Sequence, residues 1–174
     1  DEEATAELKE EILKITSGSA AENIAGFYIP FRLNFLGKFI RFGGCQQEKH
    51  LRLFRRGQGQ FTVDAVHEKM AVDGKIGHLN SLINHYSYDN LEDYFSKLNC
   101  YTSLAAIKLK NKGKKFHFWQ IFLPPWVFFQ KYFLKLGFFD GWAGFLWAIL
   151  SGVYVFVKYL KLWELQQPKS KTAA

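Results

Sequence analysis

The sequence predicts an α/β fold that is followed by a helical, aromatic C-terminal region. Between residues 26 and 88, short apolar runs, the longest of them alternating with polar residues, are separated by glycine turns, which is typical of strands. At residues 3–17 and again from residue 90, apolar residues recur at helical spacing. The 174 residues are enough for one domain with a buried core.

Residues 3–17 consist of strong helix formers, and Gly18 follows as a C-cap. Residues 26–36 form a strand with two distinct faces, in which Pro30 favours an edge position or a bulge. Shorter strands are predicted at residues 51–54, 61–66, 70–72 and 81–85. Turns are predicted at Gly57-Gln58-Gly59 and at Asp73-Gly74.

Asn90 is the predicted N-cap of a helix that ends in a run of lysines between residues 108 and 115. The aromatic segment 116–139 is broken by Pro124-Pro125, and Pro125 can open a helix that runs to Phe133. Asp140 is the predicted cap of a last helix over residues 141–163. We therefore divide the chain into a domain at 1–115, an aromatic helical region at 116–165 and a disordered tail at 166–174.

The net charge of +7 suits anionic partners such as phosphorylated sugars, nucleic acid or an acidic membrane surface. No recognition helix or aromatic RNA-binding motif accompanies the basic residues, so specific nucleic-acid readout is not indicated. The two cysteines form no Cys-x-x-Cys motif, which disfavours a zinc site and a disulfide framework and suits a reducing cytoplasm. No signal peptide is visible at Asp1, as would also hold for an internal start.

Glu68 lies between His67 and Lys69 at the end of an apolar strand, where a carboxylate can act as a general base. The alternative is a surface ion pair between Glu68 and Lys69. His67 and His85 can each ligate a metal, act in acid–base chemistry or form a hydrogen bond in a core. Carboxylates that could join them in a metal site are those of Asp1, Glu2 and Glu68.

Arg52, Arg55 and Arg56 form a dense cationic group. Guanidinium groups suit a phosphate or diphosphate because they bind it in a bidentate fork. The alternative is solvated charge at the end of a strand.

The C-terminal region carries no charged residue from Gly141 to Val157, at the lower limit of what crosses a bilayer. Tryptophan, tyrosine and lysine residues flank this run, which favours anchoring at a membrane interface. We expect helices that lie in the interface rather than a full span, because Pro124-Pro125 and Gly137 divide the region. The alternative is a hydrophobic helix pair packed on the domain or on a partner chain.

Read in order, several motifs resemble bacterial family 2 glycosyltransferases of the lipopolysaccharide core, including the inner-core beta-1,4-glucosyltransferase type. The resemblance covers nearly the whole chain. Its motifs are Asp1-Glu2, Phe35-Leu36-Gly37-Lys38, the segment Leu51 to Gly57, Val66-His67-Glu68-Lys69, Asp73-Gly74, His85-Tyr86-Ser87-Tyr88, Leu91-Glu92-Asp93-Tyr94, the segment Leu136 to Gly141 and the segment Lys158 to Trp163.

The resemblance implies the C-terminal, acceptor-side part of a Rossmann-like A-type glycosyltransferase fold with a mixed sheet. Asp1 is similar to the last aspartate of the family's metal-binding Asp-x-Asp motif, so the nucleotide-binding half would precede it. Glu68 is similar to the catalytic base, and His85 to a histidine near the metal. Arg52, Arg55, Arg56, His67 and Lys69 then become substrate-binding residues, and Mg²⁺ or Mn²⁺ the implied cofactor. Cys45-Gln46-Gln47 departs from the aromatic segment that the family often has there.

The implied activity is inverting sugar transfer from a nucleotide-sugar donor to a lipid-linked glycan, at the cytoplasmic face of the bacterial inner membrane. The competing hypothesis is a non-catalytic protein that binds a membrane surface or a partner through its basic and aromatic residues. The two differ in whether Glu68, His85 and Asp1 meet in one cleft beside the arginines.

Overall fold

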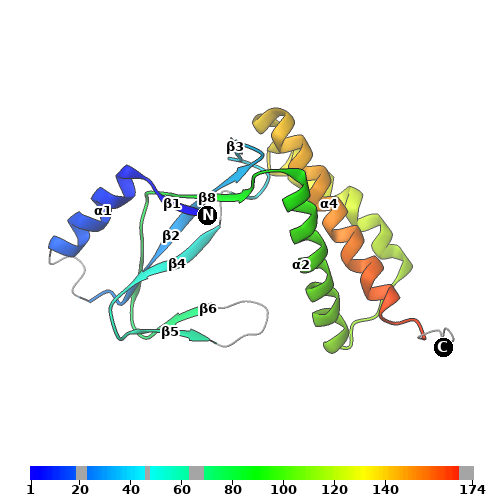
Figure 1. Cartoon of the computed structure of the whole chain (residues 1–174), viewed down its shortest axis with the longest axis horizontal. Coiled ribbons are helices and arrows are strands. Elements are labelled where there is room, and N and C mark those ends of the chain that lie inside the picture. The colour runs from blue at the N-terminus through cyan, green and yellow to red at the C-terminus, as the bar shows by residue number, and fades with distance from the viewer. Residues whose placement is uncertain (19–22, 46–47, 63–68, 169–174) are drawn as a thin grey trace. The chain divides into compact units, whose positions relative to one another are not determined.

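The computed structural model describes residues 1–18, 23–45, 48–62 and 69–168. The chain forms two compact units, Asp1–Ser87 and Tyr88–Ala174, which we call the sheet unit and the helical unit. Figure 1 shows the strands in the first and the long helices in the second. The division lies before the helix that begins at Leu91, which therefore belongs to the helical unit.

The sheet unit is built on strand β2 (Gly26–Phe35), as the alternation of residues 26–36 predicts. The sheet has the order β1-β8-β2-β3, and β4 and β7 also pair with β2. The partner strands are β1 (Glu2–Ala4), β3 (Lys38–Phe39), β4 (Lys49–Phe54), β7 (Ile76–His78) and β8 (Ile83–Tyr88). Because β4 pairs antiparallel to β2 and β7 pairs parallel to it, the sheet is mixed, and the predicted α/β class with a mixed sheet is confirmed.

Pro30 lies within this central strand, so the expectation of an edge position is wrong. The nitrogen of Phe31 donates to Glu48 beside β4, and backbone groups alternate in direction along a strand. The nitrogen of Pro30 therefore points to the other side, beyond the last β2–β7 pair, Tyr28 with His78. The missing N–H thus removes no bond to β4.

A bulge does occur in β4, at Arg52. Tyr28 pairs with Leu51 and Phe27 pairs with Leu53, so Arg52 is an extra residue in β4. A bulge of this kind turns two successive side chains toward one face of the sheet. Leu53 packs against the hydrophobic core, and Arg52 lies against Phe31 of that same core.

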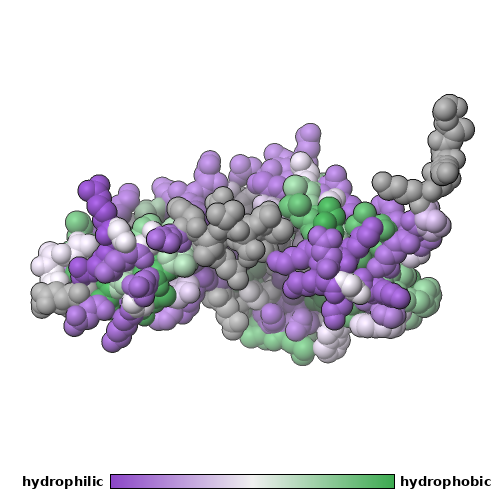
Figure 2. Space-filling view, turned by 90° about the horizontal axis from the view of Figure 1, so that it is seen from below, coloured by the Kyte–Doolittle hydropathy of each residue, from purple (hydrophilic) through white to green (hydrophobic). Residues whose placement is uncertain are grey.

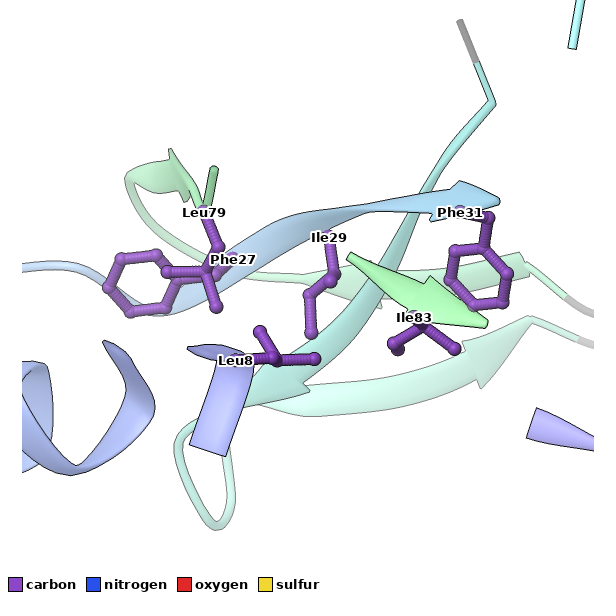
Figure 3. Packing of buried hydrophobic residues seen from close by; sticks show 6 residues of the cluster. All are labelled: Leu8, Phe27, Ile29, Phe31, Leu79 and Ile83. Carbon is purple, nitrogen blue, oxygen red and sulfur yellow. The ribbon is translucent and has the colours of Figure 1, made fainter. Parts of the chain in front are cut away.

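The core of the sheet unit lies between β2 and helix α1 (Ala6–Ser17). Phe27, Ile29 and Phe31 of β2 lie in one cluster with Leu8 of α1, which is only 1% exposed (Figure 3). The cluster consists of Leu8, Phe27, Ile29, Phe31, Leu79 and Ile83. The side chain of Thr5 caps α1 by accepting a bond from the nitrogen of Leu8. The predicted helix began at residue 3, but Glu3 and Ala4 belong to strand β1.

Strands β5 (Gly59–Thr62) and β6 (Lys69–Val72) form a separate antiparallel hairpin. The chain turns at Gly57, where φ is 85° and the Gln58 nitrogen donates to the Arg55 carbonyl. It bends at Asp73-Gly74, where Gly74 has a φ of 128°, so the chain changes direction at both predicted turns. The hairpin pairs Thr62 with Lys69 on either side of residues 63–68.

In the helical unit, the side chain of Asn90 caps helix α2 (Leu91–Asn111), as predicted. The aromatic segment forms η2 (Phe118–Phe122), α3 (Leu123–Phe129) with Pro124 and Pro125 in its first turn, and the π-helical η3 (Gln130–Leu134). A turn and η4 (Gly137–Asp140) lead into α4 (Gly141–Glu164), which starts at the predicted residue. Asp140 holds the N-cap position without a side-chain capping bond.

Helix α4 contacts both α2 and α3. On one side the Tyr94 hydroxyl donates to the Leu150 carbonyl, and Lys161 Nζ donates to Asn99, Thr102 and Ser103 of α2. On another side Gly152 lies so close to the Pro124 carbonyl that a Cβ would meet it at 3.0 Å. Beyond α4, Gln166 exchanges hydrogen bonds with Lys114 and Phe116, so this first residue of the predicted tail is anchored.

Candidate functional site

Glu2 and His85 face each other across the first and last strands of the sheet. They are directly opposite in the antiparallel β1–β8 pair, so both side chains lie on one face of the sheet. Glu2 Oε1 is 3.9 Å from His85 Nδ1. The pairing joins residues 83 positions apart in the chain and places a carboxylate beside an imidazole.

Arg52 joins this pair because the bulge in β4 turns it to the same face. Its guanidinium nitrogen Nη2 donates to Glu2 Oε1 at 2.7 Å and lies over the Phe31 ring. The ring of Phe31 also contacts those of His50 and His85, with centroids 4.6 and 5.6 Å away. We call Glu2, His50, Arg52 and His85, gathered around Phe31, the Glu2 cluster.

His85 is partly buried in the Glu2 cluster. Burial lowers the pKa of its imidazole, and the nearby Glu2 carboxylate opposes part of that shift. Its Nδ1 atom is buried and has no hydrogen-bond partner among the described residues. The imidazole therefore favours the neutral form, in which one ring nitrogen is free to accept a proton or bind a cation.

The other predicted arginines do not join the Glu2 cluster in this way. Arg55 Nε donates to the Ile24 carbonyl at 3.0 Å, and the Arg55 backbone nitrogen donates to Ala25. Arg55 also lines an apolar cavity of about 430 Å³ between the end of α1 and strands β2 and β4. Arg56 is exposed in the turn that follows.

The predicted base, Glu68, directly precedes Lys69 in the sequence. His67 and Glu68 fall outside the described residues, and Lys69 is described as the first residue of β6. Whether Glu68 meets Asp1 and His85 in one cleft therefore stays a prediction.

Asp1 is bound to β8 through its backbone. Its nitrogen donates to the Tyr86 carbonyl, and the Tyr86 nitrogen donates to the Asp1 carbonyl. In the part of the chain that the structure describes, no group of three or more histidine, cysteine or acidic residues could hold a metal ion. A metal ion bound by Asp1 and His85 therefore stays a prediction. The carboxylate that the sheet places beside the His85 imidazole is that of Glu2.

The other face of the sheet carries a second set of polar and aromatic residues, whose contacts the sequence did not predict. Arg32 donates through Nε and Nη2 to Asn84 Oδ1 and lies 4.1 Å from the centroid of the Phe39 ring. The Tyr86 hydroxyl donates to Glu3, which raises the pKa of that phenol. The alternation of β2 assigns Arg32 to this face, but its partners depend on pairings between distant strands.

No protein-family model and no solved structure matches the chain. The chain is similar to the lipopolysaccharide core biosynthesis glycosyltransferase LpsC of Rhizobium meliloti strain 1021, with 25% identity over 88% of this chain and 58% of the relative. It is also similar to uncharacterized glycosyltransferases of Rickettsia typhi and Rickettsia prowazekii, with 28% identity over 99% of this chain and 61% of each relative.

These relatives carry glycosyltransferase names, at 25–28% identity to this chain. The chain spans about three fifths of the length of the curated relatives that it matches. Donor, acceptor and mechanism are therefore matters for proposal.

Proposed function

We propose that this chain is the acceptor-side part of a family 2 inverting glycosyltransferase with a Rossmann-like A-type fold. In the whole enzyme it acts on a nucleotide-sugar donor and a lipopolysaccharide-core or other lipid-linked acceptor. The observation that carries the proposal is the similarity to glycosyltransferases along 88–99% of the chain. The Glu2 cluster adds a cation, a carboxylate and a neutral imidazole on one face of the sheet.

Glu68 is the general base of the proposed reaction. Its carboxylate removes the proton of an acceptor hydroxyl while that oxygen attacks the anomeric carbon, opposite the departing nucleoside diphosphate. The bond from the anomeric carbon to the diphosphate oxygen breaks as the new glycosidic bond forms, so the anomeric configuration inverts. His67 and Lys69 flank the base in the sequence and contact the substrates.

Arg52, Arg55 and Arg56 would stabilise the negative charge on the diphosphate. Arg52 is ion-paired with Glu2, so a diphosphate would compete with or share that contact. The Glu2 carboxylate opposes such binding, because it offsets the charge of the guanidinium and repels a second anion.

Asp1 and His85 are the proposed ligands of a Mg²⁺ or Mn²⁺ ion. The unpartnered Nδ1 of His85 fits such a role, but the described residues offer no group of three ligands. Sites for Mg²⁺ often use one or two carboxylates and complete the shell with water and substrate phosphates, so the two observations are compatible. When bound, such an ion would neutralise charge on the donor diphosphate.

The proposed location is the cytoplasmic face of the bacterial inner membrane. Residues 137–164 are long and apolar enough to cross a membrane, by length and composition. The basic and aromatic helical unit would hold the enzyme at the surface where a lipid-linked acceptor is presented.

The test is Glu68→Gln in the full-length enzyme, which keeps the shape of the side chain and removes the proton acceptor. We expect the transfer rate to fall about 10²–10⁴-fold, with an unchanged dissociation constant for the donor. Arg55→Ala is the comparison variant, and we expect it to weaken donor binding as well as the rate. A Glu68→Gln enzyme that keeps more than about a tenth of the normal rate would show that Glu68 is not the base.

A further inference from the structure

The helices that pack against α4 limit the orientations in which the helical unit can bind a bilayer. Residues Leu150 and Gly152 of α4 face different helices: the Leu150 carbonyl accepts from Tyr94 of α2, and Gly152 packs on Pro124 of α3. Two residues apart on a helix is a rotation of about 200°. Helix α4 therefore has α2 on one side and α3 on nearly the opposite side.

The start of α2 lies beside the first half and middle of α4. Tyr88 has its ring centroid 6.2 Å from that of Trp147, and Tyr94 bonds Leu150, while α4 runs from residue 141 to 164. If α4 crossed a bilayer in this packing, the first turns of α2 would lie at the depth of the hydrocarbon centre.

Charged residues occupy those first turns. Asp89, Glu92 and Asp93 are followed by Lys97, which is ion-paired with Asp93 at 2.9 Å. Lys131 of η3 lies over the ring of Trp147, at the same depth. Charged side chains near the bilayer centre are costly and rare, so five of them at this depth exclude a spanning α4 as long as it packs against α2.

The α3 side of the unit carries an exposed aromatic surface instead. Its residues recur at alternating spacings of three and four, which places them on one face of consecutive helical segments. They are Trp119, Phe122, Trp126, Phe129 and Phe133, and their exposed fractions run from 42 to 67%. We call these five residues the aromatic stripe.

The aromatic stripe is continuous through ring contacts and is bordered by an apolar groove. The rings of Trp126 and Phe129 lie 5.8 Å apart, and those of Phe129 and Phe133 lie 5.2 Å apart. The groove, of about 330 Å³, lies between α3 and α4, and exposed Ile149 and Phe156 of α4 line it. A continuous row of exposed aromatic residues of this kind indicates an interaction site for another apolar surface.

The charge of the helical unit favours an anionic bilayer as that surface. The sequence of the helical unit holds twelve lysines and five acidic residues, so the whole net charge of +7 lies there. Five of these lysines follow one another between residues 108 and 115, just before the aromatic stripe. Figure 2 shows hydrophobic groups at the margins of the helical unit with hydrophilic residues between them.

We propose that the helical unit inserts into one leaflet of an anionic bilayer through the aromatic stripe, while the outer face of α2 stays in water and α4 does not cross the membrane. The inference rests on the membrane attachment proposed above and adds its orientation.

The experiment compares one fluorescent dye at two positions in the full chain. One dye is attached at Phe129→Cys in the aromatic stripe, and the other at Ser96→Cys, an exposed residue on the face of α2 that points away from buried Tyr94 and Leu98. Both chains carry Cys45→Ala and Cys100→Ser, which remove the two free cysteines. Vesicles of phosphatidylcholine with about a third phosphatidylglycerol, with and without bromine on the acyl chains, serve as probes.

We expect both chains to sediment with the anionic vesicles, and at least tenfold less with pure phosphatidylcholine. Bromine should quench the dye at residue 129 at least threefold more than the dye at residue 96. Sedimentation with equal quenching at both positions would overturn the orientation and leave the attachment standing. Failure of either chain to sediment would overturn both, as expected if a protein segment covers the aromatic stripe.

Discussion

The two units of this chain differ in net charge, in aromatic content and in the exposure of their large aromatic side chains. The sheet unit has eleven basic and eleven acidic residues in its sequence, whereas the helical unit has the entire excess of +7. All five tryptophans lie in the helical unit. The charged groups of the Glu2 cluster are paired within the sheet unit, while large aromatic residues of the helical unit remain exposed.

This difference separates two tasks. Paired charges around a buried ring hold polar groups in fixed positions, which is what chemistry on a substrate needs. Exposed aromatic residues in a unit with an excess of positive charge suit attachment to an anionic surface, for which no fixed partner geometry is required. We therefore expect substitutions in the two units to have separable effects on folding, attachment and transfer.

The largest expected effect on folding concerns the core of the sheet unit. Leu8→Ala should lower the free energy of unfolding by about 2–5 kcal/mol, because Leu8 is 1% exposed between α1 and β2. Leu13→Ala on the same helix is the control, since Leu13 is 66% exposed. Urea unfolding followed by circular dichroism measures both. An equal decrease in the free energy of unfolding for Leu8→Ala and Leu13→Ala would contradict the placement of α1.

The next effect concerns the packing of α2 on α4 in the helical unit. Lys161→Met keeps the length of the side chain but removes its bonds to Asn99, Thr102 and Ser103. We expect a loss of about 1–2 kcal/mol, reduced because the site is partly exposed. Lys108→Met, on an exposed part of α2, serves as the control. Hydrogen exchange should quicken in α2 and α4 while the sheet unit stays protected, and a spread of faster exchange into β2 would contradict the separation into two units.

The smallest effect is a pH dependence in the sheet unit. Burial alone raises the pKa of Glu11, but hydrogen bonds from Ser81 and Asn80 outweigh it, so the pKa lies below its ordinary value. A lowered folded-state pKa means that Glu11 contributes stability above the unfolded value of about 4.3 and loses that contribution as the pH falls.

Glu11→Gln should therefore cost less than about 1 kcal/mol at neutral pH, and the difference from the unmodified protein should shrink below a pH of about 4. Unfolding in urea at several pH values measures this difference. If the difference in free energy of unfolding between the two proteins grows as the pH falls, the backbone at residues 80–81 does not stabilise the charged Glu11 carboxylate.

Local patterns in the sequence predicted the elements that have a strong period or a clear cap. The alternation of residues 26–36 predicts β2, and Asn90 predicts the start of α2, because each signal lies within a few residues of its effect. Strands β1 and β7 have only three residues each, too few for an alternation to be recognised.

The Glu2 cluster could not be predicted because it depends on tertiary structure. Glu2 meets His85 through the β1–β8 register, and Arg52 reaches them through a bulge that no local pattern indicates. The central position of β2 likewise follows from pairings with distant segments, which is why Pro30 suggested an edge. The roles of His67, Glu68 and Lys69 rest on the sequence and remain predictions.

The most direct test of the proposed division between chemistry and attachment measures transfer by the full-length enzyme to two acceptors. One acceptor is the lipid-linked glycan in anionic vesicles, and the other is the same glycan without its lipid, in solution. The variants are Glu68→Gln and a double variant, Trp126→Ser with Phe129→Ser, in the aromatic stripe.

We predict that Glu68→Gln reduces transfer to both acceptors by about 10²–10⁴-fold. The double variant should reduce transfer to the vesicle-bound acceptor at least tenfold and leave transfer to the soluble acceptor within about twofold of normal. Equal losses of the double variant on both acceptors, or full activity of Glu68→Gln on the soluble one, would contradict the account.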